Sequence, residues 1–141
     1  MRLWVLLHYQ IPATPSANRV HVWRKLKSLG ALLVHDSIWV LPATPWAVEQ
    51  FQWLASEVHE FGGTAMVWQA EVTMPGQEAD LISRFQAASE QEYRPLWDEL
   101  QEPSPALENV ARRFQQARRR DHFDCYLGQK VYEALRARRG E

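Results

Sequence analysis

Apolar positions along the first seventy residues follow the period of strands in some segments and that of helices in others. Four short runs are continuously apolar or alternate with polar residues, and they predict strands at 3–9, 31–35, 37–41 and 64–71. Two longer segments carry apolar side chains at spacings of three and four, and they predict amphipathic helices at 19–29 and 45–61. The pattern therefore predicts a mixed fold in which strands and helices alternate.

Residues that start and stop helices separate these segments. Ser16 or Asn18 is expected to cap the first helix, and Gly30 is expected to end it. Thr44-Pro45 combines an N-cap with proline at the first helical position, and Gly62-Gly63 ends the second helix. The resulting βαββαβ order over residues 1–72 is the ferredoxin-like order. We predict a four-stranded antiparallel sheet with both helices on one face.

After Pro75-Gly76 the pattern becomes helical. Three helices are predicted, at 77–101, 105–122 and 127–138. Ser104-Pro105 is expected to start the second of these helices as an N-cap followed by proline. Their apolar stripes are expected to include Leu81, Phe85, Ala88, Leu96, Trp97, Leu100, Val110, Phe114, Ala117, Leu127, Val131 and Leu135. The fold class is thus α+β, a single domain over 1–141 with a ferredoxin-like core at 1–72 and a C-terminal helical extension at 76–141.

Composition agrees with a packed protein of the cytoplasm. The chain has 141 residues, 46% of them apolar, with seven tryptophans that favour an aromatic core. The single Cys125 excludes an internal disulfide and fits a reducing compartment. No apolar run reaches the roughly 18 residues that a bilayer span requires. The apolar start lacks a cleavage site, so a signal peptide is not expected.

The net charge of −1 hides an uneven distribution. Residues 1–70 hold five basic and four acidic residues, 71–104 hold two and eight, and 105–141 hold nine and five. Two interpretations remain open from the sequence alone. The acidic and basic helices pair with each other, or the basic surface is reserved for phosphate or another anion.

Basic residues are the main candidates for a binding site. The candidates for nucleic-acid or anion binding are Arg19, Arg24, Lys25, Lys27, Arg112, Arg113, Arg118, Arg119 and Arg120. Arginines along helices can engage phosphates in bidentate fashion, and the affinity that results depends on salt. Trp23 lies among the first group, but its helical spacing predicts a core position. No helix-turn-helix can be assigned.

The sequence gives little indication of a catalytic site or a metal site. The local cluster of His122, Asp124 and Cys125 offers three potential ligands, but zinc motifs normally supply two spaced pairs. A helix end followed by a turn explains this cluster better. The sequence shows no nucleophilic triad and no glycine-rich phosphate loop. We therefore expect no catalytic residues, no metal and no cofactor.

Part of the chain resembles a bacterial regulator family. The resemblance is carried by Pro15-Ser16, Arg19-Val20, Val22 to Lys27, Gly30-Ala31, His35-Asp36, Trp39 to Pro42 and Gln50 to Leu54, and more weakly by Arg120 to Phe123. These residues are similar to the N-terminal domain of the chromate resistance protein family ChrB. The resemblance implies a non-enzymatic regulatory or sensory domain in chromate-responsive transcription regulation or chromate resistance. DNA and chromate, or another oxyanion, are the implied partners. Family members usually continue into a second domain, so the resemblance also suggests a separate ChrB C-terminal-like protein as a partner, and whether such a protein supplies that domain stays open from the sequence.

The first half also resembles, more distantly, two other families. These are the middle domain of the phenylacetate-responsive repressor PaaX and the small CRISPR-associated endoribonuclease-like proteins. In the latter, the first strand ends in a metal-binding aspartate, whereas this chain has Gln10, a poor ligand for Mg²⁺. The nearby Asp36 lies in a predicted turn, where aspartate is common. A nucleic-acid-processing protein and a homodimeric interaction module are the alternatives to a regulatory domain. We also expect the chain to form a homodimer through its ferredoxin-like half, because an unpaired edge strand must be covered.

Overall fold

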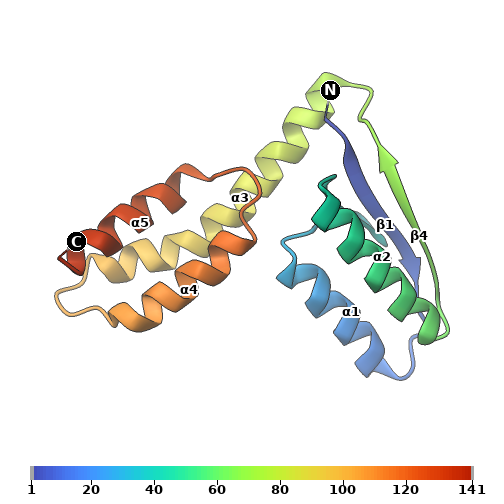
Figure 1. Cartoon of the computed structure of the whole chain (residues 1–141), viewed down its shortest axis with the longest axis horizontal. Coiled ribbons are helices and arrows are strands. Elements are labelled where there is room, and N and C mark those ends of the chain that lie inside the picture. The colour runs from blue at the N-terminus through green and yellow to red at the C-terminus, as the bar shows by residue number, and fades with distance from the viewer. Residues whose placement is uncertain (1, 141) are drawn as a thin grey trace. The chain divides into compact units, whose positions relative to one another are not determined.

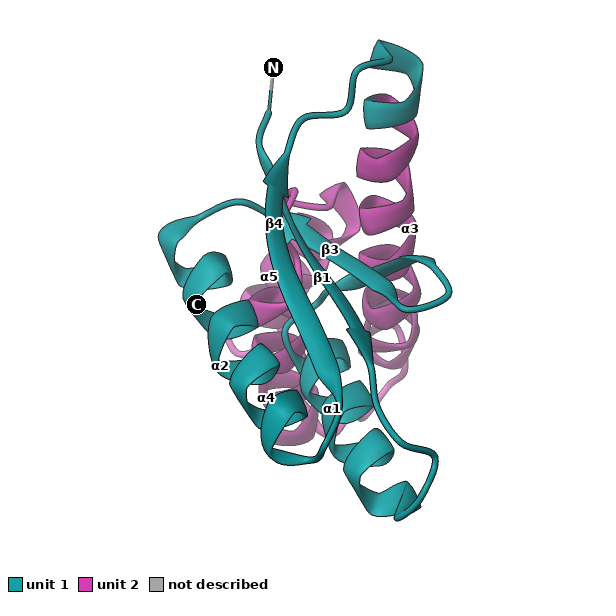
Figure 2. Cartoon of the chain, turned by 90° about the vertical axis from the view of Figure 1, so that its right-hand side faces the viewer, with its two compact units in different colours: residues 1–78 teal, residues 79–141 magenta. Residues whose placement is uncertain are grey.

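The computed structural model describes residues 2–140 and divides into two compact units, residues 1–78 and 79–141, which are coloured separately in Figure 2. The first unit holds the sheet and the second holds most of the helical part. Each unit has its own group of buried side chains. That the whole chain acts as one domain stays a prediction.

The first unit has the predicted ferredoxin-like topology. Its elements are β1 (Trp4–Gln10), α1 (Ser16–Ser28), β2 (Leu32–His35), β3 (Ile38–Pro42), α2 (Pro45–Glu60) and β4 (Thr64–Ala70). The strands follow the order β2-β3-β1-β4, and every neighbouring pair is antiparallel. Helices α1 and α2 lie on the same side of this sheet (Figure 1). The predicted fold class is thus confirmed.

Strand register explains which sheet face forms the core. Val5 lies opposite Leu41, and Leu7 lies opposite Trp39, so these four buried side chains share one face. The helices cover that face with buried residues of their own, which are Val22, Leu26, Ala47, Phe51, Leu54 and Val58. Burial of these side chains is the main source of stability in this unit.

The opposite face of the sheet is only partly covered. Trp68 and Met66 on β4 lie opposite Leu6 and His8 on β1. Their side chains are 49% and 55% exposed, although both are large and apolar. The alternation along β4 therefore leaves an apolar patch at an edge of the sheet.

Helix starts in the first unit follow the prediction at one site and contradict it at the other. The Thr44 side chain accepts a hydrogen bond from the Ala47 N–H at 3.1 Å, so the predicted cap of α2 is confirmed. Helix α1 instead begins at Ser16, after an extended Pro15, and has no side-chain cap. The prediction that Ser16 or Asn18 caps it is wrong, because both residues lie inside the helix and Pro15, whose side chain has no hydrogen-bonding group, occupies the N-cap position.

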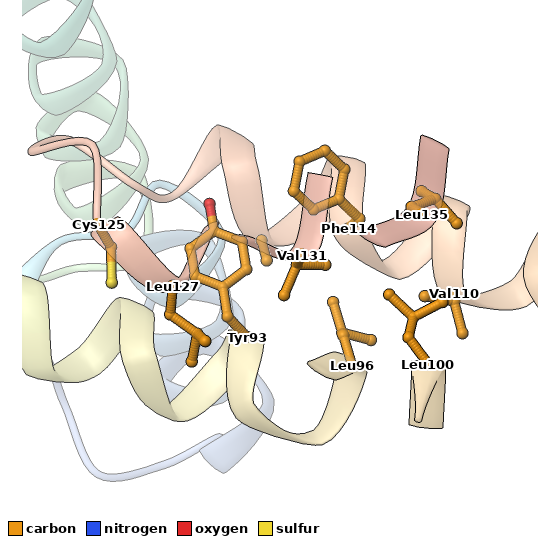
Figure 3. Close-up of a cluster of buried hydrophobic side chains, with 10 residues drawn as sticks. Tyr93, Leu96, Leu100, Val110, Phe114, Cys125, Leu127, Val131 and Leu135 are labelled. Atoms are coloured by element: carbon orange, nitrogen blue, oxygen red, sulfur yellow. The ribbon is translucent and has the colours of Figure 1, made fainter. Parts of the chain in front are cut away.

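Three helices make up the rest of the chain. Helix α3 (Pro75–Leu100) begins in the first unit, and α4 (Leu107–Arg119) and α5 (Tyr126–Arg138) follow. Figure 3 shows the core between them, in which the buried side chains are Tyr93, Leu96, Leu100, Val110, Phe114, Ala117, Cys125, Leu127, Val131 and Leu135. The predicted stripes of α4 and α5 are confirmed. On α3 the stripe passes through Ser89 and Tyr93 and leaves Ala88 exposed, contrary to the prediction.

The connection between α3 and α4 differs from the prediction. The helix does not start at Ser104-Pro105. Helix α4 begins at Leu107, and no side chain caps its N-terminus at Ala106. The Arg138 guanidinium donates to three main-chain carbonyls at the end of α3 and just after it, where carbonyls lack partners within the helix. They are the carbonyls of Leu100, Glu102 and Pro103, at 2.8, 3.0 and 2.9 Å.

Helix α4 also ends earlier than predicted, at Arg119 rather than His122. The Asp121 carboxylate organises the connection that follows. It accepts hydrogen bonds from the Tyr93 hydroxyl at 2.9 Å and from the Cys125 N–H at 3.0 Å. A carboxylate that accepts from the residue before α5 satisfies a donor at the start of that helix and prevents continuation of α4.

Candidate functional site

The four basic candidates of the first unit all lie on α1, which contains no acidic residue. Arg19, Arg24 and Lys27 are exposed, and Lys25 is partly buried. Lys25 and Lys27 occupy the last turn, where cations interact favourably with the helix dipole. Helix α1 therefore presents positive charge that its own sequence does not neutralise.

Trp23 lies on the surface rather than in the core. Its side chain is 52% exposed, whereas Val22 and Leu26 on the same helix are fully buried. Each helical residue is rotated by about 100° from the one before, so Trp23 lies at the border of the face that Val22 and Leu26 define, and there its side chain stays half exposed. The prediction that Trp23 is a core residue is wrong.

A depression of about 740 Å³ lies beside Trp23, at the end of β1. It is formed by the end of β1, the first turns of α1 and the β2–β3 turn. Its lining includes Tyr9, Gln10, Arg19, Val20, Trp23 and Asp36. Gln10 and Asp36, the two positions considered above as possible metal ligands of a nuclease, thus line the same depression.

Tyr9 is the half-buried phenol of this lining. Burial raises the pKa of the Tyr9 phenol, while a hydrogen bond with the Trp39 side chain and the charge of Arg19 act in the opposite direction. Asp36 has a positive φ of 35°, which aspartate tolerates in tight turns. The main-chain N–H of Tyr9 donates to the Ser37 carbonyl at 3.2 Å, and this bond joins the turn to β1.

The cluster of His122, Asp124 and Cys125 lies in the connection between α4 and α5. His122 packs edge-on against Phe85, with 6.1 Å between the ring centroids, and Cys125 is buried in the core. Within residues 2–140, no group of three or more histidine, cysteine, aspartate or glutamate side chains is placed to hold a metal. The cluster thus has the geometry of a helix end and a turn.

Two of the basic candidates in the second unit form ion pairs with the acidic helix α3. Arg120 makes a bidentate pair with Glu92, with nitrogen–oxygen distances of 2.8 to 3.0 Å. Arg113 pairs with Glu99 at 2.6 Å. Pairing between the acidic and basic helices therefore accounts for these two side chains.

The remaining candidates of this unit are not neutralised in that way. The Arg118 guanidinium lies over the rings of Phe114 and Tyr132, at 5.7 and 5.5 Å from their centroids. Such contacts orient an arginine without removing its charge. Arg112 and Arg119 are exposed.

Arg112 belongs to a second hollow, a cleft of about 670 Å³ between α4 and α5. We call it the arginine cleft, and its lining includes Glu108, Arg112, Phe114, Tyr132, Arg136 and Arg139. Arg139 lies 3.5 Å from Glu108, whose carboxylate is 95% exposed, so this pair is weak. Arg136 lies over Tyr132, with 5.7 Å to the ring centroid. The arginine cleft is thus a partly aromatic surface with three guanidinium groups.

Arg136 and Arg139 were not among the predicted site residues. A signal for them exists in the sequence, since Tyr132, Leu135, Arg136 and Arg139 recur at the spacing of one helix face. The consecutive arginines at 118–120 form a denser basic cluster in the sequence, so the prediction favoured them over Arg136 and Arg139. In the folded chain the three arginines have different surroundings. Among the described residues, only Arg120 of the three makes an ion pair with α3.

Helix α3 is the longest helix of the chain, and it is too polar to cross a membrane. Within residues 2–140, no helix is both long enough and apolar enough to cross a membrane.

Comparison with known proteins identifies the family of this chain. The family described as "Protein ChrB, N-terminal" matches residues 19–102, which run from α1 to just past the end of α3. Protein ChrB of Cupriavidus metallidurans is 33% identical over 87 residues, and these cover 62% of this chain and 27% of the relative. The chain thus matches about a quarter of the length of that relative. No solved structure matches the chain significantly. Because the family match covers more than half of the sequence, this chain belongs to the ChrB N-terminal family.

Proposed function

We propose that this chain is a non-enzymatic regulatory domain in chromate-responsive gene control, and that its arginine cleft binds the phosphates of DNA. Membership of the ChrB N-terminal family supports the chromate context. The observation that carries the binding role is the group of three arginines in the cleft, namely Arg112, Arg136 and Arg139.

Chromate and phosphate are both tetrahedral oxyanions with several hydrogen-bond acceptors. A guanidinium group binds such anions through two parallel N–H donors. A cleft that holds a DNA phosphate would therefore also accept chromate, and chromate would compete with DNA. This competition gives a simple physical basis for a response to chromate.

The test is an electrophoretic mobility shift with DNA from the genomic neighbourhood of the protein, with and without chromate. The proposal expects a shift that weakens when chromate is added. Combined replacement of Arg112, Arg136 and Arg139 by Gln should weaken binding. It should also flatten the salt dependence by about 0.9 in log–log slope for each phosphate that the variant no longer neutralises.

A matched control replaces Arg118, Arg119 and Arg120 together by Ala. Arg120 is paired with Glu92, and none of these three arginines lines the cleft, so this variant should lose less affinity than the cleft variant. Equal binding by the cleft variant and the parent protein would contradict the assignment of the cleft. Absence of any shift at low salt would contradict the DNA-binding role.

The same purified protein should not cleave DNA or RNA in the presence of Mg²⁺ or Mn²⁺. Among the described residues that line the depression at the end of β1, Asp36 is the one carboxylate, and it lies beside the neutral Gln10. These lining residues thus form no two-carboxylate metal site. Metal-dependent cleavage that disappears in Asp36→Ala would support the nucleic-acid-processing alternative instead.

We also propose that the chain forms a homodimer through its sheet. The exposed apolar pair Met66 and Trp68 lies on the edge strand β4, and an exposed apolar edge favours self-association. Light scattering at micromolar concentration should give twice the chain mass, and Trp68→Ser should give the monomer mass. Trp53→Ser serves as the control, because Trp53 is 64% exposed on α2. A monomeric parent protein would exclude this assembly.

A further inference from the structure

The depression beside Trp23 has no part in the proposed DNA contact, and it lies entirely within the first unit. It brings together residues from three parts of the chain, and each contributes a different chemistry. Trp23 and Val20 are apolar, Arg19 is cationic, and Gln10 and Asp36 carry hydrogen-bonding groups. A binding site for a small molecule requires this kind of convergence of apolar surface with few polar groups.

The indole of Trp23 is the main apolar surface of the depression. It is 52% exposed although it lies on the well-packed helix α1. The exposed Trp53 differs, because its Nε1–H donates to Glu49 at 3.3 Å and it lines none of the depression. An exposed indole at the edge of a hollow offers a flat ring on which a planar ligand can stack.

A cation lies beside this ring on the same helix. Arg19 precedes Trp23 by four residues, so the two side chains occupy the same face of α1. Within residues 2–140, Arg19 forms no ion pair with a carboxylate, and α1 supplies no acidic neighbour. The guanidinium is therefore available to a ligand that carries a phosphate.

Hydrogen-bonding groups face the same hollow from the sheet side. Gln10 ends β1, and Asp36 occupies the β2–β3 turn that the Tyr9–Ser37 hydrogen bond fixes to β1. Both side chains are exposed. The Asp36 carboxylate is acceptor-only, whereas the Gln10 amide is both donor and acceptor. Together they match the edge of a nucleobase that carries N–H donors and a carbonyl.

We propose that this depression binds a nucleoside phosphate, with the base stacked on Trp23, its edge bonded by Asp36 and Gln10, and its phosphate held by Arg19. An inorganic oxyanion alone would leave the indole unused, and an uncharged aromatic ring would leave Arg19 unused. The ligand is either a free nucleotide or one nucleotide of a single strand, since both have this chemistry. Lys27 follows Trp23 by four residues on α1 and would meet the next phosphate of a strand.

The experiment is calorimetric titration of the full chain with guanosine 5′-monophosphate, guanosine and ribose 5-phosphate. Guanine is the probe because its edge presents two kinds of N–H donor to a carboxylate. The expected result is one binding event per chain that depends on the base, so that guanosine 5′-monophosphate binds more tightly than either fragment. Binding of ribose 5-phosphate as tight as that of the nucleotide would overturn the proposal, as would absence of nucleotide binding at millimolar concentration.

Variants assign the binding to this depression. Trp23→Leu and Arg19→Gln should each weaken nucleotide binding by about tenfold, in line with the removal of one stacking or one charged interaction. Trp53→Leu and Arg24→Gln are the matched controls, an exposed indole on α2 and a cation of α1, and they should leave binding unchanged. Thermal unfolding checks that every variant is folded. Equal weakening in the variants and their controls would overturn the assignment.

Two further titrations distinguish a free nucleotide from a single strand as the ligand, and this proposal from the proposed DNA contact. A single-stranded hexanucleotide that binds more tightly than the free nucleotide, and that Lys27→Gln weakens selectively, identifies a strand as the ligand. Equal or weaker binding identifies the free nucleotide. The arginine-cleft variant should retain the base-dependent binding of the nucleotide, so failure of the DNA proposal would leave this site testable. Loss of nucleotide binding in that variant would contradict a site in the first unit.

Discussion

The cations of α1 and those of α4 look alike in the sequence but differ in their surroundings. Helix α1 carries Arg19, Arg24, Lys25 and Lys27 without any acidic residue, and within residues 2–140 no carboxylate forms an ion pair with them. Helix α4 and its C-cap carry five arginines, and α3 neutralises two of them through Glu92 and Glu99. A basic run therefore identifies a binding surface only after its intramolecular partners are known.

Glycine substitutions should give the largest difference between the two units. A Cβ on Gly63 would lie 2.3 Å from the Gln10 carbonyl oxygen, whereas a Cβ on Gly128 would lie 2.7 Å from ring carbons of Tyr93. A main-chain atom can move less than a side chain. We therefore expect Gly63→Ala to lower the free energy of unfolding by about 3 kcal/mol and Gly128→Ala by about 2 kcal/mol.

Denaturant unfolding followed by tryptophan fluorescence and circular dichroism measures both effects. Gly76→Ala is the control, because a Cβ there meets nothing within 4 Å, and it should change stability by less than about 1 kcal/mol. If Gly63→Ala were as stable as the parent protein, the close approach of β4 to the end of β1 would be contradicted.

Two phenols that are withdrawn from solvent give a second, smaller contrast. Burial raises the pKa of Tyr93, and the hydrogen bond to Asp121 raises it further. Because the folded-state pKa exceeds the unfolded value of about 10, the stability that Tyr93 contributes is full below pH 10 and declines as the pH rises above it. Tyr93→Phe should cost about 1 kcal/mol at neutral pH and reduce this alkaline decline.

Tyr9→Phe should behave in the same direction with a smaller effect, since the charge of Arg19 and the bond with Trp39 counteract burial at Tyr9. Unfolding measured at several pH values between neutrality and about pH 11 tests both variants, because this range spans the ordinary tyrosine pKa. An alkaline decline that is identical in Tyr93→Phe and the parent protein would show that Tyr93 does not cause it.

Charge removal should produce the smallest effects, and it tests the difference between α1 and α4 directly. Arg120→Ala breaks the bidentate pair with Glu92 and should cost about 1 kcal/mol, whereas Arg24→Ala should cost less than about 0.5 kcal/mol. A double-mutant cycle with Glu92→Gln isolates the coupling. Equal costs for Arg120→Ala and Arg24→Ala would mean that the pairing on α3 contributes no stability.

Helix and strand order could be predicted because they depend on local periodicity. The βαββαβ order, the cap at Thr44 and the core stripes of α4 and α5 all follow from residues close in sequence. The predicted bounds of α4 failed at both ends, where residues distant in sequence bond to the connecting segments. Arg138 binds main-chain carbonyls of the connection before α4, and Asp121 binds Tyr93 and Cys125 in the connection after it.

Topology, family and the supply of basic residues thus follow from the order of amino acids alone. Which of those basic residues are free to bind depends on the folded chain, because ion pairs and solvent exposure depend on neighbours from other elements. Folding places Arg113 and Arg120 against α3 and groups Arg112 with Arg136 and Arg139. It also turns Trp23 outward beside Arg19, since Val22 and Leu26 fix the buried face of α1.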